Sequence, residues 1–218
     1  MILAIDTSGP FCSVAFLDCG SDTVIAQRSD NIGRGHAEHL LPMIDELLEQ
    51  HSFKWKEIEA VGCVTGPGSF TGLRVGLAAA KGLAFSLAKP CIGVSAFEAF
   101  AQNNDEPICV IMNAKRNEFW LQNFNTLVDS VEVPKAVAAD TVFESISPDI
   151  TLLAGSGAWD LAEQDDRYNV LSDALSPPIE SVAHLTKSRI KNANEYPAIP
   201  LYLRAPDAKP QTKLVIKN

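Results

Sequence analysis

The sequence predicts an α/β fold built from two similar halves. Apolar segments typical of strands alternate with amphipathic segments typical of helices along the 218-residue chain, and this alternation favours a layered α/β architecture. A strand–turn–strand pattern at residues 2–16 recurs at residues 108–124, and aligning Asp6 with Asn113 gives an offset of 107 residues. Because a duplicated fold would leave such a repeat, we expect two related lobes.

The first half is expected to begin with a hairpin. Apolar residues 2–5 precede a polar turn at residues 6–10, and a strand pattern resumes at residues 13–17. Residues 36–50 predict a helix because their leucines and isoleucine fall on one broad face, and Pro42 lies in the first turns, where a missing N–H is tolerated. Residues 60–64 predict a strand, and residues 74–88 predict a second helix.

The second half carries weaker patterns. Helices are expected at residues 140–146 and 178–191, and strands at residues 151–154 and 169–171. The polar segment 102–107 lies between the two halves and is typical of a linker. We therefore expect an N-terminal α/β lobe at residues 1–103 and a C-terminal α/β lobe at residues 104–218.

Composition excludes several classes of protein. No run of 18 apolar residues predicts a membrane span, and no basic segment precedes Asp6 as in a secretory signal, so we expect a cytoplasmic protein. The five cysteines form no Cys-x-x-Cys pair and are interpreted as reduced thiols. The net charge of −9 disfavours direct tRNA binding, and the basic tail at Lys209, Lys213 and Lys217 is interpreted as a solvated terminus.

The most distinctive motif is the run GPGSFTGLR at residues 66–74, between a predicted strand and a predicted helix. Glycines allow close approach of the backbone to another surface, and the N–H groups of a helix start favour anions. A P-loop would end in Gly-Lys-Ser/Thr. The corresponding residues here are Gly72, Leu73 and Arg74, so a P-loop is not expected.

Five motifs in order resemble the TsaB (YeaZ) family: ILAIDTS at residues 2–8, GPGSFTGLR at 66–74, AKGLA at 80–84, IGVSAFE at 92–98 and PLYLR at 200–204. The resemblance covers nearly the whole chain and is dense up to about residue 100. It implies a duplicated actin/Hsp70/sugar-kinase-like (ribonuclease H-like) α/β fold with a truncated second lobe.

The resemblance also implies a function. Proteins similar to this one are non-catalytic partners of TsaD, which forms N6-threonylcarbamoyladenosine at position 37 of ANN-decoding tRNAs with the ATPase TsaE. The chain would bind and activate TsaD, and it would contact tRNA only indirectly. Relatives use the two helices of the first lobe to form a helical bundle with TsaD or with a second copy, and the sequence leaves open whether the free chain is a homodimer. The interface residues expected here are His36, Leu40, Ile44, Phe70, Gly72, Arg74, Gly76 and Ala80.

Nucleotide contact is a further expectation from the wider fold, in which the first hairpin cups phosphates. The candidate residues are Asp6, Thr7 and Ser8, with Gly155 and Gly157 in a second polar turn. Asp, Thr and Ser are also ordinary turn formers, and the Gly155–Gly157 turn is interpreted as a connecting loop. Relatives commonly have Asp at the position of Asn113, and an amide lacks the anionic oxygen that Mg²⁺ prefers. We therefore expect no cofactor for the chain alone, with ATP or ADP and Mg²⁺ considered only for the complex.

No metal site is expected. TsaD has a Gly-Val-Asn-His-x-x-x-His pattern that binds metal, whereas Ala96 and Phe100 stand at the two histidine positions here and offer no donor atom. His36 and His39 lack a third ligand nearby and are interpreted as solvated or facing a partner. Two alternatives stay open at this point: a small-molecule kinase or ATPase of the same fold, and, disfavoured, a glycoprotease-like metallopeptidase.

Overall fold

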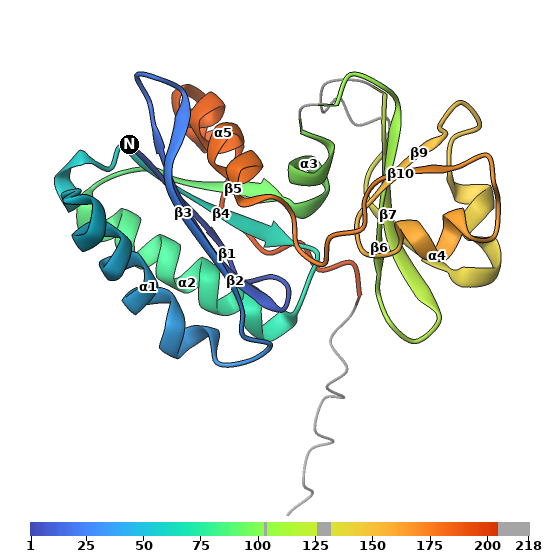
Figure 1. Cartoon of the computed structure of the whole chain (residues 1–218), viewed down its shortest axis with the longest axis horizontal. Coiled ribbons are helices and arrows are strands. Elements are labelled where there is room, and N and C mark those ends of the chain that lie inside the picture. The colour runs from blue at the N-terminus through green and yellow to red at the C-terminus, as the bar shows by residue number, and fades with distance from the viewer. Residues whose placement is uncertain (103, 126–131, 205–218) are drawn as a thin grey trace, which may run out of the picture.

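The computed structural model describes residues 1–102, 104–125 and 132–204, and the lysines of the C-terminal tail lie outside them. Two sheets lie side by side (Figure 1). The first has the strand order β3-β2-β1-β4-β5, in which β2 is antiparallel to β1 and β3, whereas β4 is parallel to β1 and β5. Its strands are β1 (Ile2–Asp6), β2 (Phe11–Asp18), β3 (Thr23–Asn31), β4 (Ala60–Gly66) and β5 (Cys91–Ser95).

The second sheet repeats this topology. Its order is β10-β9-β6-β7-β8, so β6, β7 and β8 form the antiparallel part and β9 and β10 continue it in parallel, as in the first sheet. The duplicated fold predicted from the repeated hairpin is thus confirmed. The strands are β6 (Ile108–Asn113), β7 (Glu118–Phe124), β8 (Lys135–Ala138), β9 (Leu152–Ala154) and β10 (Asn169–Ser172).

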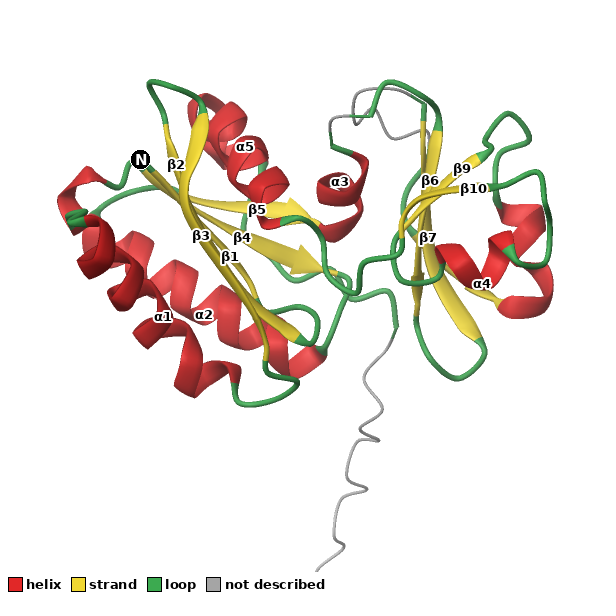
Figure 2. Cartoon of the chain, in the orientation of Figure 1, coloured by secondary structure: helices red, strands yellow, loops and turns green. Residues whose placement is uncertain are grey.

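Helices cover both faces of the first sheet (Figure 2). On one face, α1 (His36–His51) and α2 (Phe70–Leu87) pack over Leu3, Ile5 and Phe16. On the other, α5 (Ile179–Arg189) and α3 (Ala96–Ala101) pack over Ile2 and Ala4. The second sheet carries only short elements, which accounts for its smaller size: α4 (Ala158–Ala162) and the 3₁₀ helix η2 (Ala139–Ser145). Two more 3₁₀ turns are η1 (Trp55–Glu57) and η3 (Ile190–Glu195).

The structure differs from the sequence-based expectations at several elements: β3 was not predicted, and the helix expected at residues 140–146 is the 3₁₀ helix η2. Two further differences affect the site. First, α2 begins at Phe70 rather than at residue 74, because the Ser69 side chain caps the helix by accepting a hydrogen bond from Gly72 N at 3.3 Å. Second, α5 comes from the second half of the chain yet packs against β1, β2 and β4. The division at residue 103 therefore stays a prediction. The first sheet is covered by residues from both sides of that division.

Among the residues that the structure describes, none of the helices is both long enough and apolar enough to cross a membrane.

Candidate functional site

The glycine-rich loop packs directly against the turn of the first hairpin. Ser69 N donates to Ser8 O at 2.7 Å, and the hydroxyl of Thr7 donates to Gly72 O at 2.7 Å. A Cβ atom on Gly68 would collide with the Ser8 carbonyl, and one on Gly72 would collide with the Thr7 carbonyl. The glycines are thus required for close approach, and the surface that they approach is part of the same chain.

Asp6 is buried at the end of β1. Its Oδ1 accepts a hydrogen bond from Ser8 N at 2.7 Å, while Oδ2 has no hydrogen-bond partner among the described residues. Burial raises the pKa of this carboxyl above its ordinary value, although the Ser8 hydrogen bond and the nearby His36 oppose the shift. The Asp6 side chain is therefore buried inside the fold, and it lines neither of the two depressions described below.

A cleft of about 1170 Å³ lies between the two sheets. Of the residues predicted to contact nucleotide, only Ser8 lines it. The amides of the second turn are used within the chain, because Gly155 N donates to Ser172 O at 2.8 Å and Gly157 N donates to Ile111 O at 3.1 Å. These two glycines thus form the connecting loop between β9 and α4, and their amides are not free to bind phosphate.

Asn113 lies at the edge of the cleft and organises a turn. Its Oδ1 accepts from Lys115 N at 2.9 Å, its Nδ2 donates to Asp160 Oδ2 at 3.2 Å, and its backbone N–H donates to Ser156 Oγ at 3.1 Å. The Nδ2–Asp160 contact requires an amide donor, which an aspartate at this position would lack. The departure from the acidic residue of the relatives therefore fits a structural role in this chain.

A second depression is an apolar groove of about 510 Å³ between α1 and α2. Leu41 and Phe70 line it and are 47% and 44% exposed. The guanidinium carbon of Arg74 lies 3.8 Å from the centroid of the Phe70 ring, and the ring of Tyr202 lies 5.3 Å from Phe70. Exposed apolar side chains beside an aromatic–arginine cluster are typical of a protein-binding surface. The groove is lined by Ala37, Leu40, Leu41, Phe70, Thr71, Arg74, Val75, Ala78 and Ala79.

The predicted interface residues differ in exposure, and their contact with a partner stays a prediction. Phe70 and Arg74 line the groove and are exposed, and Leu40 lines its buried floor. In contrast, Ile44, Gly76 and Ala80 are buried within the first half of the chain, and the largely buried His36 and Gly72 lie at the lining of the cleft between the sheets. A Cβ on Gly76 would lie 2.5 Å from the Thr7 hydroxyl, so this stripe of small residues packs on the chain's own sheet.

The groove is lined by the face of α2 next to the one that carries Gly72, Gly76 and Ala80. Val75, Ala78 and Ala79 line the groove, and Leu41 and Tyr202 add exposed apolar area. Val75, Ala78 and Ala79 are three or four residues apart, so the sequence places them on one face of the helix. This spacing is the sequence signal that indicates the groove-lining face.

The two histidines near the start of α1 differ in environment. His36 is buried, and its Nε2 lies 3.2 Å from Phe11 O, whereas His39 is exposed. The prediction of a solvated pair is therefore wrong for His36, and His39 is exposed as expected. The described residues hold no group of three or more His, Cys, Asp or Glu side chains placed to bind a metal ion.

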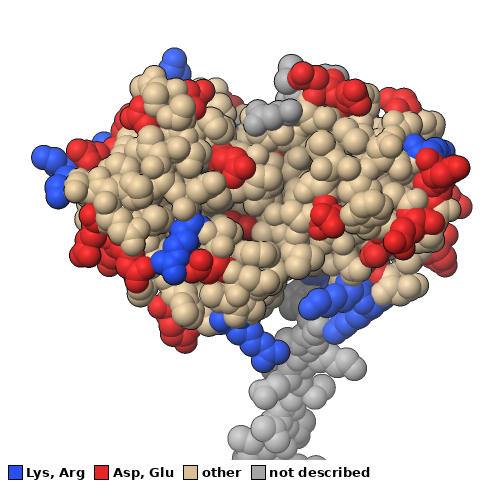
Figure 3. Space-filling model, in the orientation of Figure 1, with Lys and Arg blue, Asp and Glu red and all other residues tan. Residues whose placement is uncertain are grey.

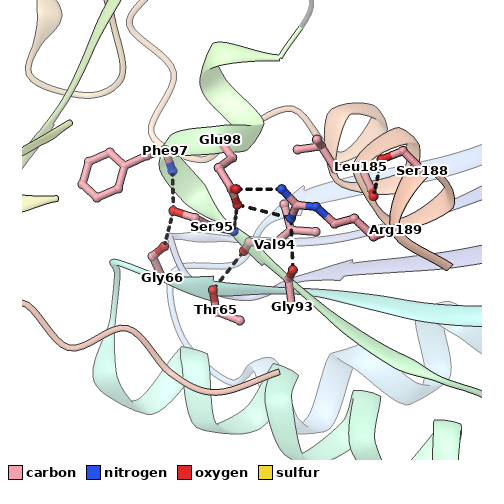
Figure 4. Close-up of polar contacts among 10 residues, drawn as sticks. All are labelled: Thr65, Gly66, Gly93, Val94, Ser95, Phe97, Glu98, Leu185, Ser188 and Arg189. Carbon is pink, nitrogen blue, oxygen red and sulfur yellow. Dashed lines mark hydrogen bonds and ion pairs between the residues drawn. The ribbon is translucent and has the colours of Figure 1, made fainter. Parts of the chain in front are cut away.

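The segment compared above with the TsaD histidines instead holds an ion pair (Figure 4). Glu98 on α3 accepts from Arg189 on α5 at 2.6 and 3.2 Å, and Glu98 also caps its own helix by accepting from Ser95 N at 2.9 Å. Arg189 donates further to Gly93 O at 3.2 Å. Ala96 is buried. The ion pair between Glu98 and Arg189 joins α3 to α5.

The cysteines are free, and three of them are buried in the sheets. Burial raises the pKa of Cys12 to about 11 and that of Cys109 to about 12. Such thiols stay protonated near neutral pH and are poor nucleophiles.

Comparison with known proteins gives a consistent set of similarities. Residues 24–175 match the family model described as TsaD, tRNA N6-adenosine threonylcarbamoyltransferase. The chain is 39% identical over 124 residues to the tRNA threonylcarbamoyladenosine biosynthesis protein TsaB of Haemophilus influenzae, covering 55% of this chain and 51% of that protein. The match thus spans about half the length of this curated relative.

Two further similarities extend over almost the whole chain. An uncharacterized protein of Mycobacterium tuberculosis is 30% identical over 209 residues, which cover 96% of this chain and 94% of that protein. The structure described as YeaZ from Pseudomonas aeruginosa superposes with a TM-score of 0.75 at 26% identity, covering 93% of this chain and 99% of that one.

Proposed function

We propose a function from the premise that the chain belongs to the TsaB (YeaZ) family, whose curated members are named tRNA threonylcarbamoyladenosine biosynthesis proteins. The chain is an accessory subunit that binds and activates TsaD in forming N6-threonylcarbamoyladenosine at position 37 of ANN-decoding tRNAs. TsaE is the further partner. The chain supplies a docking surface and leaves the chemistry to TsaD.

The α1–α2 groove is the observation that carries this proposal. Leu41, Phe70 and Ala78 leave an apolar surface open to solvent between two helices whose opposite faces pack on the sheet. A helix of TsaD placed in this groove would remove that apolar area from water, which favours association. Arg74 at the rim would pair with an acidic or aromatic side chain of the partner.

The donor groups around the cleft support a non-catalytic role. Asp6 is buried and Thr7 is bonded to Gly72, so neither is available to hold a nucleotide–magnesium complex in this conformation. The amides of Gly155 and Gly157 are likewise bonded within the chain. The kinase or ATPase alternative therefore gains no support from the first hairpin or from the second turn.

The distribution of charge supports indirect contact with tRNA. The net charge is −9, and acidic side chains lie over both halves of the face in Figure 3, with basic ones in separate spots. Such a surface repels the phosphate backbone. We therefore place tRNA on TsaD and not on this chain.

The groove can be tested by one substitution with a matched control. Ala78→Trp fills the groove at an exposed position, whereas Ser86→Trp adds the same side chain to an exposed position of α2 outside it. We expect Ala78→Trp to weaken TsaD binding by about 30-fold or more, as expected for a blocked hot spot, and Ser86→Trp to leave binding unchanged. Calorimetry with purified TsaD measures both, and equal binding by all three proteins would remove the groove from the interface.

Activation of TsaD needs a separate measurement. TsaD, TsaE, the adenylate-forming enzyme, ATP, threonine, bicarbonate and tRNA are combined with and without the chain, and the modified nucleoside is quantified by mass spectrometry. Product that depends on the chain, and that Ala78→Trp reduces, is the expected result. Equal product without the chain, from a matched set of partners, would contradict the proposal.

A further inference from the structure

The last described segment of the chain, residues 196–204, runs along the first sheet after η3. Gly93 N on β5 donates to Tyr196 O at 2.9 Å, and Leu201 N donates to Thr65 O on β4 at 2.8 Å. These backbone bonds fix the path of the segment, so the side chains that follow Leu201 have defined positions. We refer to residues 201–204 as the strap.

The strap contacts the groove on one side. The Tyr202 ring packs on Phe70 with 5.3 Å between ring centroids, and the Arg74 Nε lies 3.5 Å from the Tyr202 hydroxyl. Phe70 and Arg74 both line the α1–α2 groove. Tyr202 therefore supports the two side chains that give the groove its aromatic and cationic end.

The strap contacts the second sheet on the other side. Arg204 forms an ion pair with Glu118 on β7, and Arg204 also lines the cleft between the sheets. Tyr202 and Arg204 are separated by one residue, and two residues of extended chain span at most about 7 Å, so the two contacts of the strap lie close together along the chain. The side chains of Arg204 and Glu118 are 28% and 40% exposed, so groups entering the cleft can reach the pair.

We propose that the strap couples the cleft between the two sheets to the α1–α2 groove, because Arg204 engages Glu118 of the second sheet while Tyr202 supports Phe70 and Arg74 in the groove. An anionic group in the cleft would compete with Glu118 for Arg204. Tyr202 would then hold the side chains of Phe70 and Arg74 less firmly. The importance of this coupling for partner binding rests on the proposed function. The coupling itself is a property of the free chain and is tested there.

The first test measures amide hydrogen exchange in the free, full-length chain. Glu118→Gln removes the ion pair on the second sheet, at a residue that is not part of the groove lining. We expect exchange to rise by up to about fivefold, the scale of one partly exposed ion pair, at Leu201 N and in the first turn of α2, where Leu73 N donates to Ser69 O. Exchange confined to β7, or no change, would overturn the proposal.

A matched control separates coupling from a general loss of charge. Glu132→Gln breaks an exposed ion pair with Lys135, which begins the edge strand β8 of the same sheet. This variant should leave exchange at Leu201 and Leu73 as in the unsubstituted chain. An equal rise in both variants would mean that the second half is destabilised as a whole, and the proposal would fail.

A second test uses a double-mutant cycle with Tyr202→Ala. If the strap transmits the effect, Glu118→Gln should raise exchange in the first turn of α2 only when Tyr202 is present. Additive effects would show two independent contacts and would overturn the coupling. Binding to TsaD is then measured separately: loss of coupling with retained TsaD binding leaves the proposed function standing, and coupled exchange without TsaD binding leaves the strap but removes that function.

Discussion

The hydroxyl of Thr7 donates a hydrogen bond to the carbonyl oxygen of Gly72 at 2.7 Å, and so ties the first hairpin to the start of α2. Both residues are buried. Gly76 lies one turn further along α2, and a Cβ atom there would be only 2.5 Å from the same Thr7 hydroxyl oxygen. The turn that could face a ligand in the cleft is thereby used to fix the helix that forms one wall of the groove.

Removing this hydroxyl tests its structural role. We expect Thr7→Val, which keeps the shape of the side chain, to lower the free energy of unfolding by about 1–2 kcal/mol, because a buried polar contact is lost. Thr71→Val removes a hydroxyl from an exposed position of α2 and should change stability by less than about 0.5 kcal/mol. Urea unfolding followed by circular dichroism gives both values, and equal stability of the two variants would contradict the assigned role.

Two glycines of α2 predict opposite responses to alanine. A Cβ on Gly76 would lie 2.5 Å from Thr7 Oγ1, whereas a Cβ on Gly82 would meet nothing within 4 Å. Gly82→Ala should therefore stabilise the protein by up to about 1 kcal/mol through helix propensity alone. Gly76→Ala should destabilise it, because the forced shift of Thr7 outweighs that gain. Thermal unfolding measures the sign of each change in stability. An increase in stability for Gly76→Ala would show that Thr7 can move aside at little cost.

The ion pair between Glu98 and Arg189 should contribute strongly to stability. Arg189→Met leaves Glu98 without its partner, and we expect a loss of about 2–3 kcal/mol, below the range for fully buried pairs because the Glu98 side chain is 25% exposed. Arg28→Met, which breaks exposed pairs with Asp30 and Glu46, serves as the control and should cost no more than about 1 kcal/mol. The same small loss in both variants would contradict a special role for the pair between α3 and α5.

Asp6 predicts a specific dependence of stability on pH. Its pKa is raised in the folded state, so between the unfolded and folded pKa values the folded chain binds more protons, and stability falls as pH rises through that window. Asp6→Asn keeps an oxygen to accept from Ser8 N and removes the titration. We expect its stability relative to the unsubstituted chain to increase from acid toward neutral pH in a series of urea unfolding curves. A constant difference across that range would show that Asp6 does not titrate as inferred.

Much of the fold could be predicted because it is encoded in local patterns. Residues 36–50 have a clear helical period and residues 60–64 are a short apolar run, and α1 and β4 were placed closely. β3 was missed because this edge strand is largely solvent-exposed and rich in polar residues, so it has no apolar run. The packing of α5 on the first sheet depends on contacts between distant residues, which no local pattern reveals.

The groove illustrates what spacing cannot decide. α2 has small or apolar residues around much of its circumference, so the rows containing Gly76 and Ala78 look alike in the sequence. Which row meets the sheet is decided by the fit of Gly72 and Gly76 to Thr7, a contact across 65 residues or more. Tyr202 belongs to a motif that the sequence presents far from α2, and only the fold brings it to Phe70.

The position of α5 has a consequence for how the chain is made. The face of β1, β2 and β4 that α5 covers is complete as a sheet once β5 has been synthesised, yet its cover begins only at Ile179. At ordinary translation rates the ribosome needs on the order of ten seconds to make the intervening residues. During that interval the nascent chain would present an apolar sheet face to solvent, so we expect chaperones to engage it. A nascent chain stalled on the ribosome before Ile179 should carry more bound chaperone than the released full-length chain.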